Sequence, residues 1–104
     1  MIYISGPMSG VAEFNFPLFQ HVADALRARG HAVVSPHEKG GEVESGDVAW
    51  DRYLRADIAA MMTCKQIVLL PGWPKSRGAK LELSIALGLG FDVFYWQDNT
   101  LVAA

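Results

Sequence analysis

The chain has 104 residues, of which 51% are hydrophobic and 19% charged, and its formal net charge is −2. This length predicts a single domain, residues 1–104, and the composition excludes a wholly disordered chain. Nine basic against eleven acidic residues give no net attraction to nucleic acid or to an anionic membrane surface. Because Cys64 is the single cysteine, an internal disulfide and a cysteine-based metal site are excluded.

The sequence carries no sign of membrane insertion or export. No apolar run approaches the ~18 residues that a membrane span needs. A strand pattern begins at the first residues, with no basic region ahead of it, so we expect no signal peptide. A single cysteine also fits a reducing compartment, and we therefore expect a cytoplasmic protein.

Short β-rich runs alternate with segments of helical periodicity along the chain. Strands are expected at residues 2–4, 32–34, 66–70 and 92–96. Helices are expected at residues 17–29, 47–63 and 79–89. Pro17 suits the first turn of the first helix, and Gly30 is expected directly after its end. Residues 37–46 have the composition of a mobile loop, and residues 97–104 are expected to be peripheral.

The order β-α-β-α-β-α-β predicts an α/β fold in which a parallel sheet has helices on both faces. We predict a flavodoxin- or Rossmann-like open sheet of four or five strands, with the first four in the order 2-1-3-4. Ligands of such sheets bind at the carboxyl ends of the strands, at the switch point between strands 1 and 3. In this chain those ends carry residues 5–10 and 71–78, so we expect the site there.

An acidic residue occupies the inner face of the third predicted helix. Lys80 and Ser84 mark the polar side of this helix, and Glu82 points roughly 160–200° away from both. A buried carboxylate without partners costs several kcal/mol or more, so a chain keeps one only if it is paired or does chemistry. The structural alternative is a glutamate bonded to a loop amide or to an arginine.

The second predicted helix repeats this feature, because Asp57 lies within its apolar stripe. The alternative is an acid paired with Arg52, with Arg55 or with a backbone amide. Two neighbouring carboxyl groups push each other's pKa values apart, so that one stays ionised while the other carries a proton. Glycosyl-transfer enzymes use such a pair as nucleophile and general acid.

Two loops are candidates for holding a substrate. Residues 6–10 are glycine-rich, which lets a backbone approach a ligand closely, but they lack the G-x-G-x-x-G dinucleotide motif and could be a plain turn. Residues 74–78 enter a helix N-terminus, where N–H groups bind phosphate, and Ser76 and Gly78 are the binding candidates. An ordinary N-cap role for Ser76 is the alternative. The Tyr3 hydroxyl could reach the carboxyl end of the sheet, or belong to a core tyrosine bonded to some acceptor. The histidines show no metal-ligand spacing, and no metal site is expected.

These residues together resemble the nucleoside 2-deoxyribosyltransferase superfamily, and most closely its small branch known as domain of unknown function 4406. The likeness spans about residues 1–95. It is carried by Ile2–Gly10, Asn15–Pro17, Tyr53–Ile58, Val68–Trp73, Ser76–Ala79 and the pair Leu81-Glu82.

The resemblance implies a role for each matched residue. Glu82 matches the nucleophilic glutamate, Tyr3 the tyrosine that orients it, and Asp57 the acid that assists departure of the nucleobase. Ser76 matches the serine of the nucleoside 5′-monophosphate hydrolases, where the transferases have aspartate. The loop around sugar and phosphate is matched by Gly6, Met8, Ser9 and Gly10.

The resemblance also implies a homodimer or a higher homo-oligomer and a reaction that needs no metal or organic cofactor. In better-known relatives a neighbouring subunit completes each active site with a polar residue, for which this chain offers Asp98, Asn99 or Thr100. The chain departs from the superfamily at Ser9, where the hydrolases often have arginine, and at Lys65, where many relatives have aspartate.

The leading hypothesis is an N-glycosidase or deoxyribosyltransferase acting on a (deoxy)nucleoside 5′-monophosphate, with hydrolysis and transfer both open. The alternatives are a non-catalytic module that binds a nucleotide or an ADP-ribose-like ligand, and a structural oligomerisation domain. A dehydrogenase is disfavoured by the absent glycine motif, although Glu38 follows the second strand. The expected partner is a small nucleoside or nucleotide, with no nucleic acid and no membrane.

Overall fold

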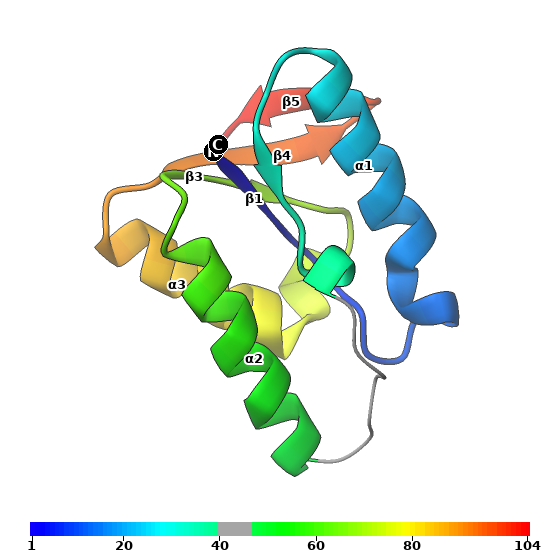
Figure 1. The fold of residues 1–104 in the computed structure, drawn as a ribbon, viewed down its shortest axis with the longest axis vertical. Coiled ribbons are helices and arrows are strands. Elements are labelled where there is room, and N and C mark those ends of the chain that lie inside the picture. Colours follow the sequence, from blue (N-terminus) through cyan, green and yellow to red (C-terminus); the bar gives the residue numbers. More distant parts are fainter. Residues whose placement is uncertain (40–46) are drawn as a thin grey trace.

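The computed structural model describes the backbone of residues 1–39 and 47–104, and the side chains of residues 1–38 and 52–104. Within it, five strands form one sheet in the order β2-β1-β3-β4-β5 (Figure 1). The strands are β1 (Ile2–Ser5), β2 (Val33–Val34), β3 (Gln66–Leu69), β4 (Asp92–Gln97) and β5 (Thr100–Ala103). The first four pair in parallel, so the α/β class and the order 2-1-3-4 predicted from the sequence are confirmed.

Residues 97–104, expected to be peripheral, lie at the sheet edge, where residues 100–103 form the fifth strand that the prediction of four or five strands had left open. Residues 100–103 pair with β4 in antiparallel register. The connecting residues Asp98 and Asn99 both have a left-handed backbone, with φ of 51° and 58°. Two consecutive left-handed residues make the tight hairpin turn whose twist matches that of the flanking strands. The chain therefore folds back and adds β5 to the sheet.

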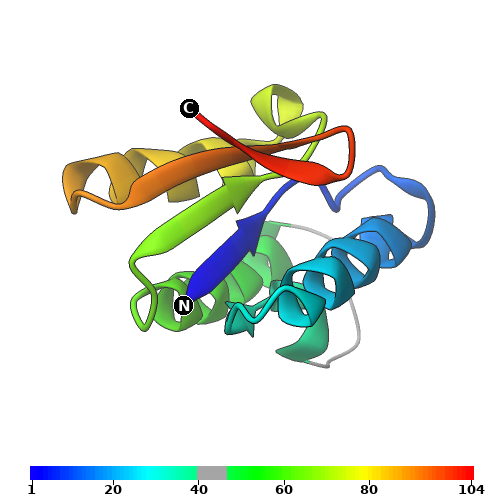
Figure 2. The ribbon, with the colours of Figure 1, turned by 90° about the horizontal axis from the view of Figure 1, so that it is seen from above.

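Helices cover both faces of the sheet, as expected (Figures 1 and 2). The helix α1 (Phe16–Ala28) lies on one face, and α2 (Asp47–Met61) and α3 (Arg77–Gly88) lie on the other. Each bound falls within two residues of its predicted position. Gly30 follows α1 with φ of 91°, and the N–H of His31 bonds the carbonyl of Leu26 at 3.1 Å, which closes the helix as the glycine predicts. Among the described residues no helix has the length and apolarity needed to cross a membrane.

Strand alternation divides the core into two clusters, because successive side chains point to opposite faces of a sheet. The α1 side contains Ile2, Ile4, Val68, Leu70 and Trp96, packed against Phe19, Val22, Ala23 and Leu26. The other side contains Tyr3, Ile67 and Leu69, packed against Ala60, Met61, Cys64 and Ala86. Tyr3 therefore faces α2 and α3, and Ser5, two residues further along β1, shares its face.

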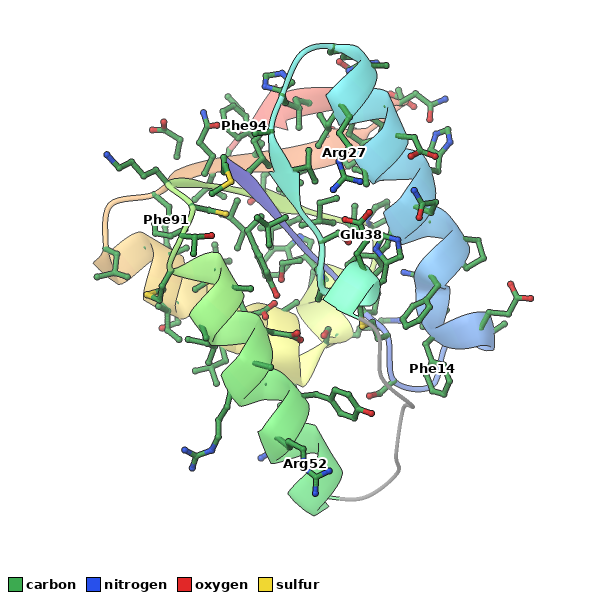
Figure 3. The ribbon with its side chains drawn as sticks, viewed as in Figure 1. Phe14, Arg27, Glu38, Arg52, Phe91 and Phe94 are labelled. Atoms are coloured by element: carbon green, nitrogen blue, oxygen red, sulfur yellow. The ribbon has the colours of Figure 1, made fainter. Side chains whose placement is uncertain are left out.

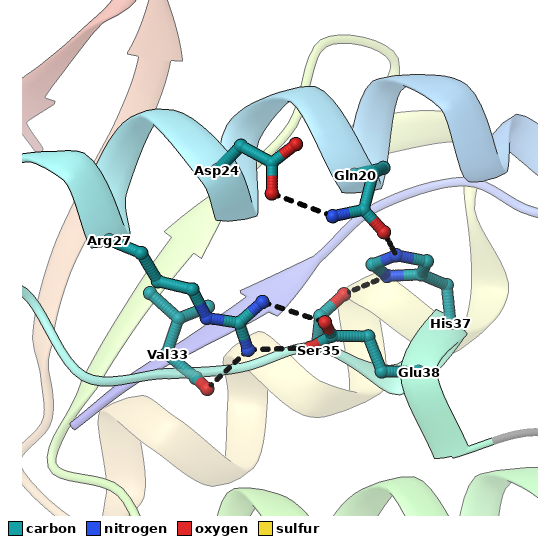
Figure 4. Close-up of polar contacts among 7 residues, drawn as sticks. All are labelled: Gln20, Asp24, Arg27, Val33, Ser35, His37 and Glu38. Carbon is teal, nitrogen blue, oxygen red and sulfur yellow. Dashed lines mark hydrogen bonds and ion pairs between the residues drawn. The ribbon is translucent and has the colours of Figure 1, made fainter.

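A polar network ties α1 to the short 3-10 turn that follows β2 (Figures 3 and 4). Arg27 donates two hydrogen bonds to the Glu38 carboxylate, each at 2.6 Å. His37 bonds the Ser35 hydroxyl through Nδ1 and the Gln20 side chain through Nε2. Of the loop expected at residues 37–46, the first three residues thus belong to this turn, and residues 40–46 lie outside the described part. Glu38, the residue that had kept a dehydrogenase open, is paired with Arg27.

Candidate active site

A buried carboxylate lies between α3 and the sheet. Glu82, in the second turn of α3, is only 5% exposed. The Tyr3 hydroxyl donates a hydrogen bond to its Oε2 at 2.7 Å, and the Ser5 hydroxyl donates one to its Oε1 at 2.7 Å. The inward direction predicted by helical periodicity is therefore confirmed. The partners that the structure shows are two strand hydroxyls, rather than the loop amide or the arginine of the alternative.

The environment of Glu82 changes its acidity. The pKa of Glu82 is raised from 4.5 to about 7, chiefly by burial; the hydrogen bonds from Ser5 and Tyr3 lower it, and the negative charge of Asp57 raises it further. Burial, and then the charge of Glu82, raise the pKa of Tyr3 well above its ordinary value. Tyr3 therefore stays a neutral phenol and a hydrogen-bond donor at neutral pH. Near pH 7 Glu82 can either hold a proton or present a poorly solvated carboxylate that is more basic than an ordinary glutamate.

Asp57 acts on the same centre from α2. Its side chain is half-buried, and its charge raises the pKa of both Tyr3 and Glu82. The three residues singled out by sequence as catalytic are thus electrostatically coupled, although they come from β1, α2 and α3. Two interacting carboxyl groups of this kind favour a state in which one is ionised and the other protonated.

Sequence reasoning missed Ser5 as a member of this cluster. It placed Ser5 at the start of the loop after the first strand and assigned it no role. The available signal was its position two residues after Tyr3, because residues i and i+2 of a strand lie on the same face. Ser5 is fully buried, and its hydroxyl donates to Oε1 of Glu82, the carboxylate oxygen that Tyr3 does not bond.

The predicted binding loop after β1 is divided between two environments. Gly6 is required by packing, since a Cβ there would lie 2.7 Å from the Cβ of Leu70. Met8 packs against the core on the α1 side, which is the face opposite to Glu82. Ser9 and Gly10 are exposed, and the φ of 78° at Gly10 suits glycine. Of these four predicted residues, Ser9 and Gly10 are therefore the two that face solvent beyond the carboxyl end of β1.

Ser76 adopts the structural role that had been left open beside phosphate binding. Its Oγ accepts a hydrogen bond from the N–H of Ala79 at 3.1 Å, which makes it the N-cap of α3. Accepting this bond leaves the hydroxyl proton available for donation to another group. Gly78 is half-buried in the first turn of the same helix.

Comparison with known proteins identifies the family and supports the fold. The sequence model of a protein family described as "Domain of unknown function (DUF4406)" matches residues 1–95. The chain belongs to the DUF4406 family. A solved structure described as a 2-deoxyribosyltransferase from Bacillus psychrosaccharolyticus superposes with a TM-score of 0.68 at 22% sequence identity, covering 90% of this chain and 69% of that chain. At this identity the match shows a shared fold. No curated protein matches the sequence.

Several further side chains of this DUF4406 protein pack within the fold. Cys64 is buried. Trp73 stacks on Tyr95 with ring centroids 6.2 Å apart, and Phe14 lies beside Phe16 at the start of α1 (Figure 3). In the part of the chain that the structure describes, no group of three His, Cys, Asp or Glu side chains is placed to hold a metal ion.

Proposed function

We propose that this DUF4406 protein cleaves the N-glycosidic bond of a (deoxy)nucleoside 5′-monophosphate through the carboxylate of Glu82. One observation carries the proposal: a nine-tenths-buried glutamate with a hydroxyl donor on each oxygen and a second acid beside it. A glutamate held in this way, at the ligand-binding edge of a parallel sheet, has the geometry and the basicity of a nucleophile. The 2-deoxyribosyltransferase that shares this fold is, by its name, an enzyme that transfers a 2-deoxyribosyl group.

In the proposed reaction the Glu82 carboxylate attacks C1′ of the sugar, and the bond between C1′ and the base nitrogen breaks. Asp57 is proposed to give a proton to the departing base from the state of the coupled pair in which Asp57, and not Glu82, holds the shared proton. Tyr3 holds the plane of the attacking carboxylate. Water, or the nitrogen of a second base, then attacks C1′ of the glycosyl-enzyme and releases Glu82, while Asp57 takes up the proton of that nucleophile.

The 5′-phosphate is proposed to bind at the start of α3. Backbone N–H groups in the first turn of a helix, together with the positive end of its dipole, favour a phosphate. Ser76 caps this turn, and the exposed side chains of Lys75 and Arg77 flank it. The serine at this position supports a phosphorylated sugar, because a carboxylate there would repel the phosphate.

The test is an incubation of the purified protein with ribo- and deoxyribonucleoside 5′-monophosphates and with the matching nucleosides, followed by chromatography of the free base. We expect base release from the monophosphates and its loss in Glu82→Gln. The matched control is Asp92→Asn, since Asp92 is exposed at the amino end of β4, and this variant should keep full activity.

Each outcome of this experiment bears on a different part of the proposal. If the wild type releases no base from any substrate, or Glu82→Gln releases as much as the wild type, the proposed catalysis is wrong. Equal release from nucleosides and monophosphates would refute the phosphate site alone. Saturable binding without turnover would favour the non-catalytic nucleotide-binding module.

A further inference from the structure

Ser5, the last residue of β1, contacts the proposed nucleophile but has no role in the reaction described above. Ser5 is fully buried, and its hydroxyl lies 2.7 Å from Oε1 of Glu82. The hydroxyl of Tyr3, two residues earlier on the same strand, donates a hydrogen bond to Oε2 at the same distance. The two donors therefore share one carboxylate, one oxygen each.

We propose that Ser5 is a positioning residue for Glu82, which fixes the plane of its carboxylate and holds it in the ionised, attacking form. This inference rests on the proposed function, because it assigns Ser5 a part in the same reaction. The Ser5 hydroxyl donates to the nucleophile and acts through it.

Geometry explains why one donor is not enough. The terminal torsion of a glutamate is broad, so a carboxylate with a single hydrogen bond can still turn about that contact. A second donor on the other oxygen removes this rotation. Tyr3 and Ser5 lie two residues apart on one strand, about 7 Å along it. The long tyrosine side chain spans most of that distance, and the hydroxyls of both residues thus meet at one carboxylate.

Proton counting explains why the pair favours the ionised form. A hydroxyl has one proton to donate, and here both protons are directed at Glu82. If Glu82 were protonated, its own O–H would need an acceptor, and one of the two hydroxyls would have to turn away. The two donors accordingly lower the pKa of Glu82, against the effects of burial and of the Asp57 charge. The titratable groups that act on Glu82 are Tyr3 from β1 and Asp57 from α2, and the Cys64 thiol acts in turn on Tyr3.

The test compares Ser5→Ala, which removes only the hydroxyl, with Ser5→Thr, which keeps one. Loss of one hydrogen bond to a carboxylate is expected to raise the midpoint of the acidic limb of kcat/KM by about one pH unit. The activity of Ser5→Ala should then fall about fivefold at pH 7 and return to near the wild-type value at pH 9. Ser5→Thr should keep the wild-type pH profile. An unchanged acidic limb in Ser5→Ala would overturn the proposal, since a merely structural serine would lower activity equally at every pH.

A second readout does not depend on activity. The carboxyl carbon of Glu82 can be titrated by NMR in glutamate-labelled protein and assigned by its absence in Glu82→Gln. We expect a midpoint near 7 in the wild type and a higher one in Ser5→Ala. A raised midpoint without any base release would show that Ser5 holds the Glu82 carboxylate in its ionised form and would refute the proposed reaction. An unmoved midpoint, in a variant whose melting curve shows it to be folded, would refute the role of Ser5 whether or not the protein is active.

Discussion

Replacing Glu82 with glutamine is expected to stabilise the folded protein at neutral and alkaline pH while removing its proposed activity. The pKa of Glu82 is about 7 in the folded protein and 4.5 for an ordinary, solvated glutamate. Between these two values the folded state holds a proton that the unfolded state has released. The free energy of unfolding therefore falls as the pH rises from 4.5 through 7, and the total loss is about 3 kcal/mol at 1.36 kcal/mol per pH unit.

Glutamine reproduces the protonated form at every pH. Its carbonyl accepts a hydrogen bond from one hydroxyl, and its amide donates to the oxygen of the other, once that hydroxyl has turned. The variant and the wild type should thus be equally stable at pH 4.5. At pH 8 the free energy of unfolding of the variant should exceed that of the wild type by up to about 3 kcal/mol. In a chain of this size such a difference raises the Tm by about 10 °C or more.

The assay is thermal unfolding followed by circular dichroism at pH 4.5, 6 and 8, with Asp92→Asn as the control. Asp92 is exposed, so its variant should show no comparable pH dependence relative to the wild type. If Glu82→Gln differs from the wild type by the same Tm at all three pH values, burial does not raise the pKa of Glu82 and the reasoning fails. A confirmed result would mean that this chain retains a carboxylate that destabilises it, as expected of a group kept for function.

Further substitutions test the packing and the polar contacts of the fold around the site and on the surface. Gly6→Ala should lower the free energy of unfolding by about 1–3 kcal/mol, because its Cβ would lie 2.7 Å from the Cβ of Leu70. Gly88→Ala in α3, where a Cβ would meet no atom of another element within 4 Å, should be neutral or stabilise by up to about 1 kcal/mol. Equal denaturation midpoints for the two variants would contradict the packing argument. Ser76→Ala removes the N-cap of α3 and should cost about 1 kcal/mol in urea unfolding, and no loss would show that the cap is unimportant. Arg27→Gln removes an exposed ion pair and should cost less than about 1 kcal/mol, so a larger loss that persists in 1 M salt would be unexpected.

Much of the site was accessible from local patterns. The period of the third helix placed Glu82 on the face opposite to Lys80 and Ser84, and Glu82 is buried in the structure. The roles of Tyr3 and Asp57 came from resemblance to known sequences, and these roles remain proposals. The structure adds that both side chains influence the acidity of Glu82.

Two features depended on information that no local pattern contains. The Ser5 hydroxyl meets Glu82 across 77 positions of sequence, and this contact exists only because α3 packs over β1. Ser76 was compatible with both a cap and a phosphate ligand, since the same residue types serve both purposes at a helix start. The hydrogen bond from Ala79 shows the cap, and the phosphate role rests on the proposal.

The sequence by itself determined the α/β class, the order of the first four strands, the helix positions and the direction in which Glu82 points. These are consequences of backbone periodicity and of the handedness of crossovers, which hold for any chain with this pattern. Only the tertiary structure decided which hydroxyls reach the two carboxylate oxygens, which glycine is required by a neighbouring leucine, and how β5 extends the sheet beyond β4. Such contacts depend on the volumes and distances of side chains brought together from distant elements, and those are defined only when the helices are packed on the sheet.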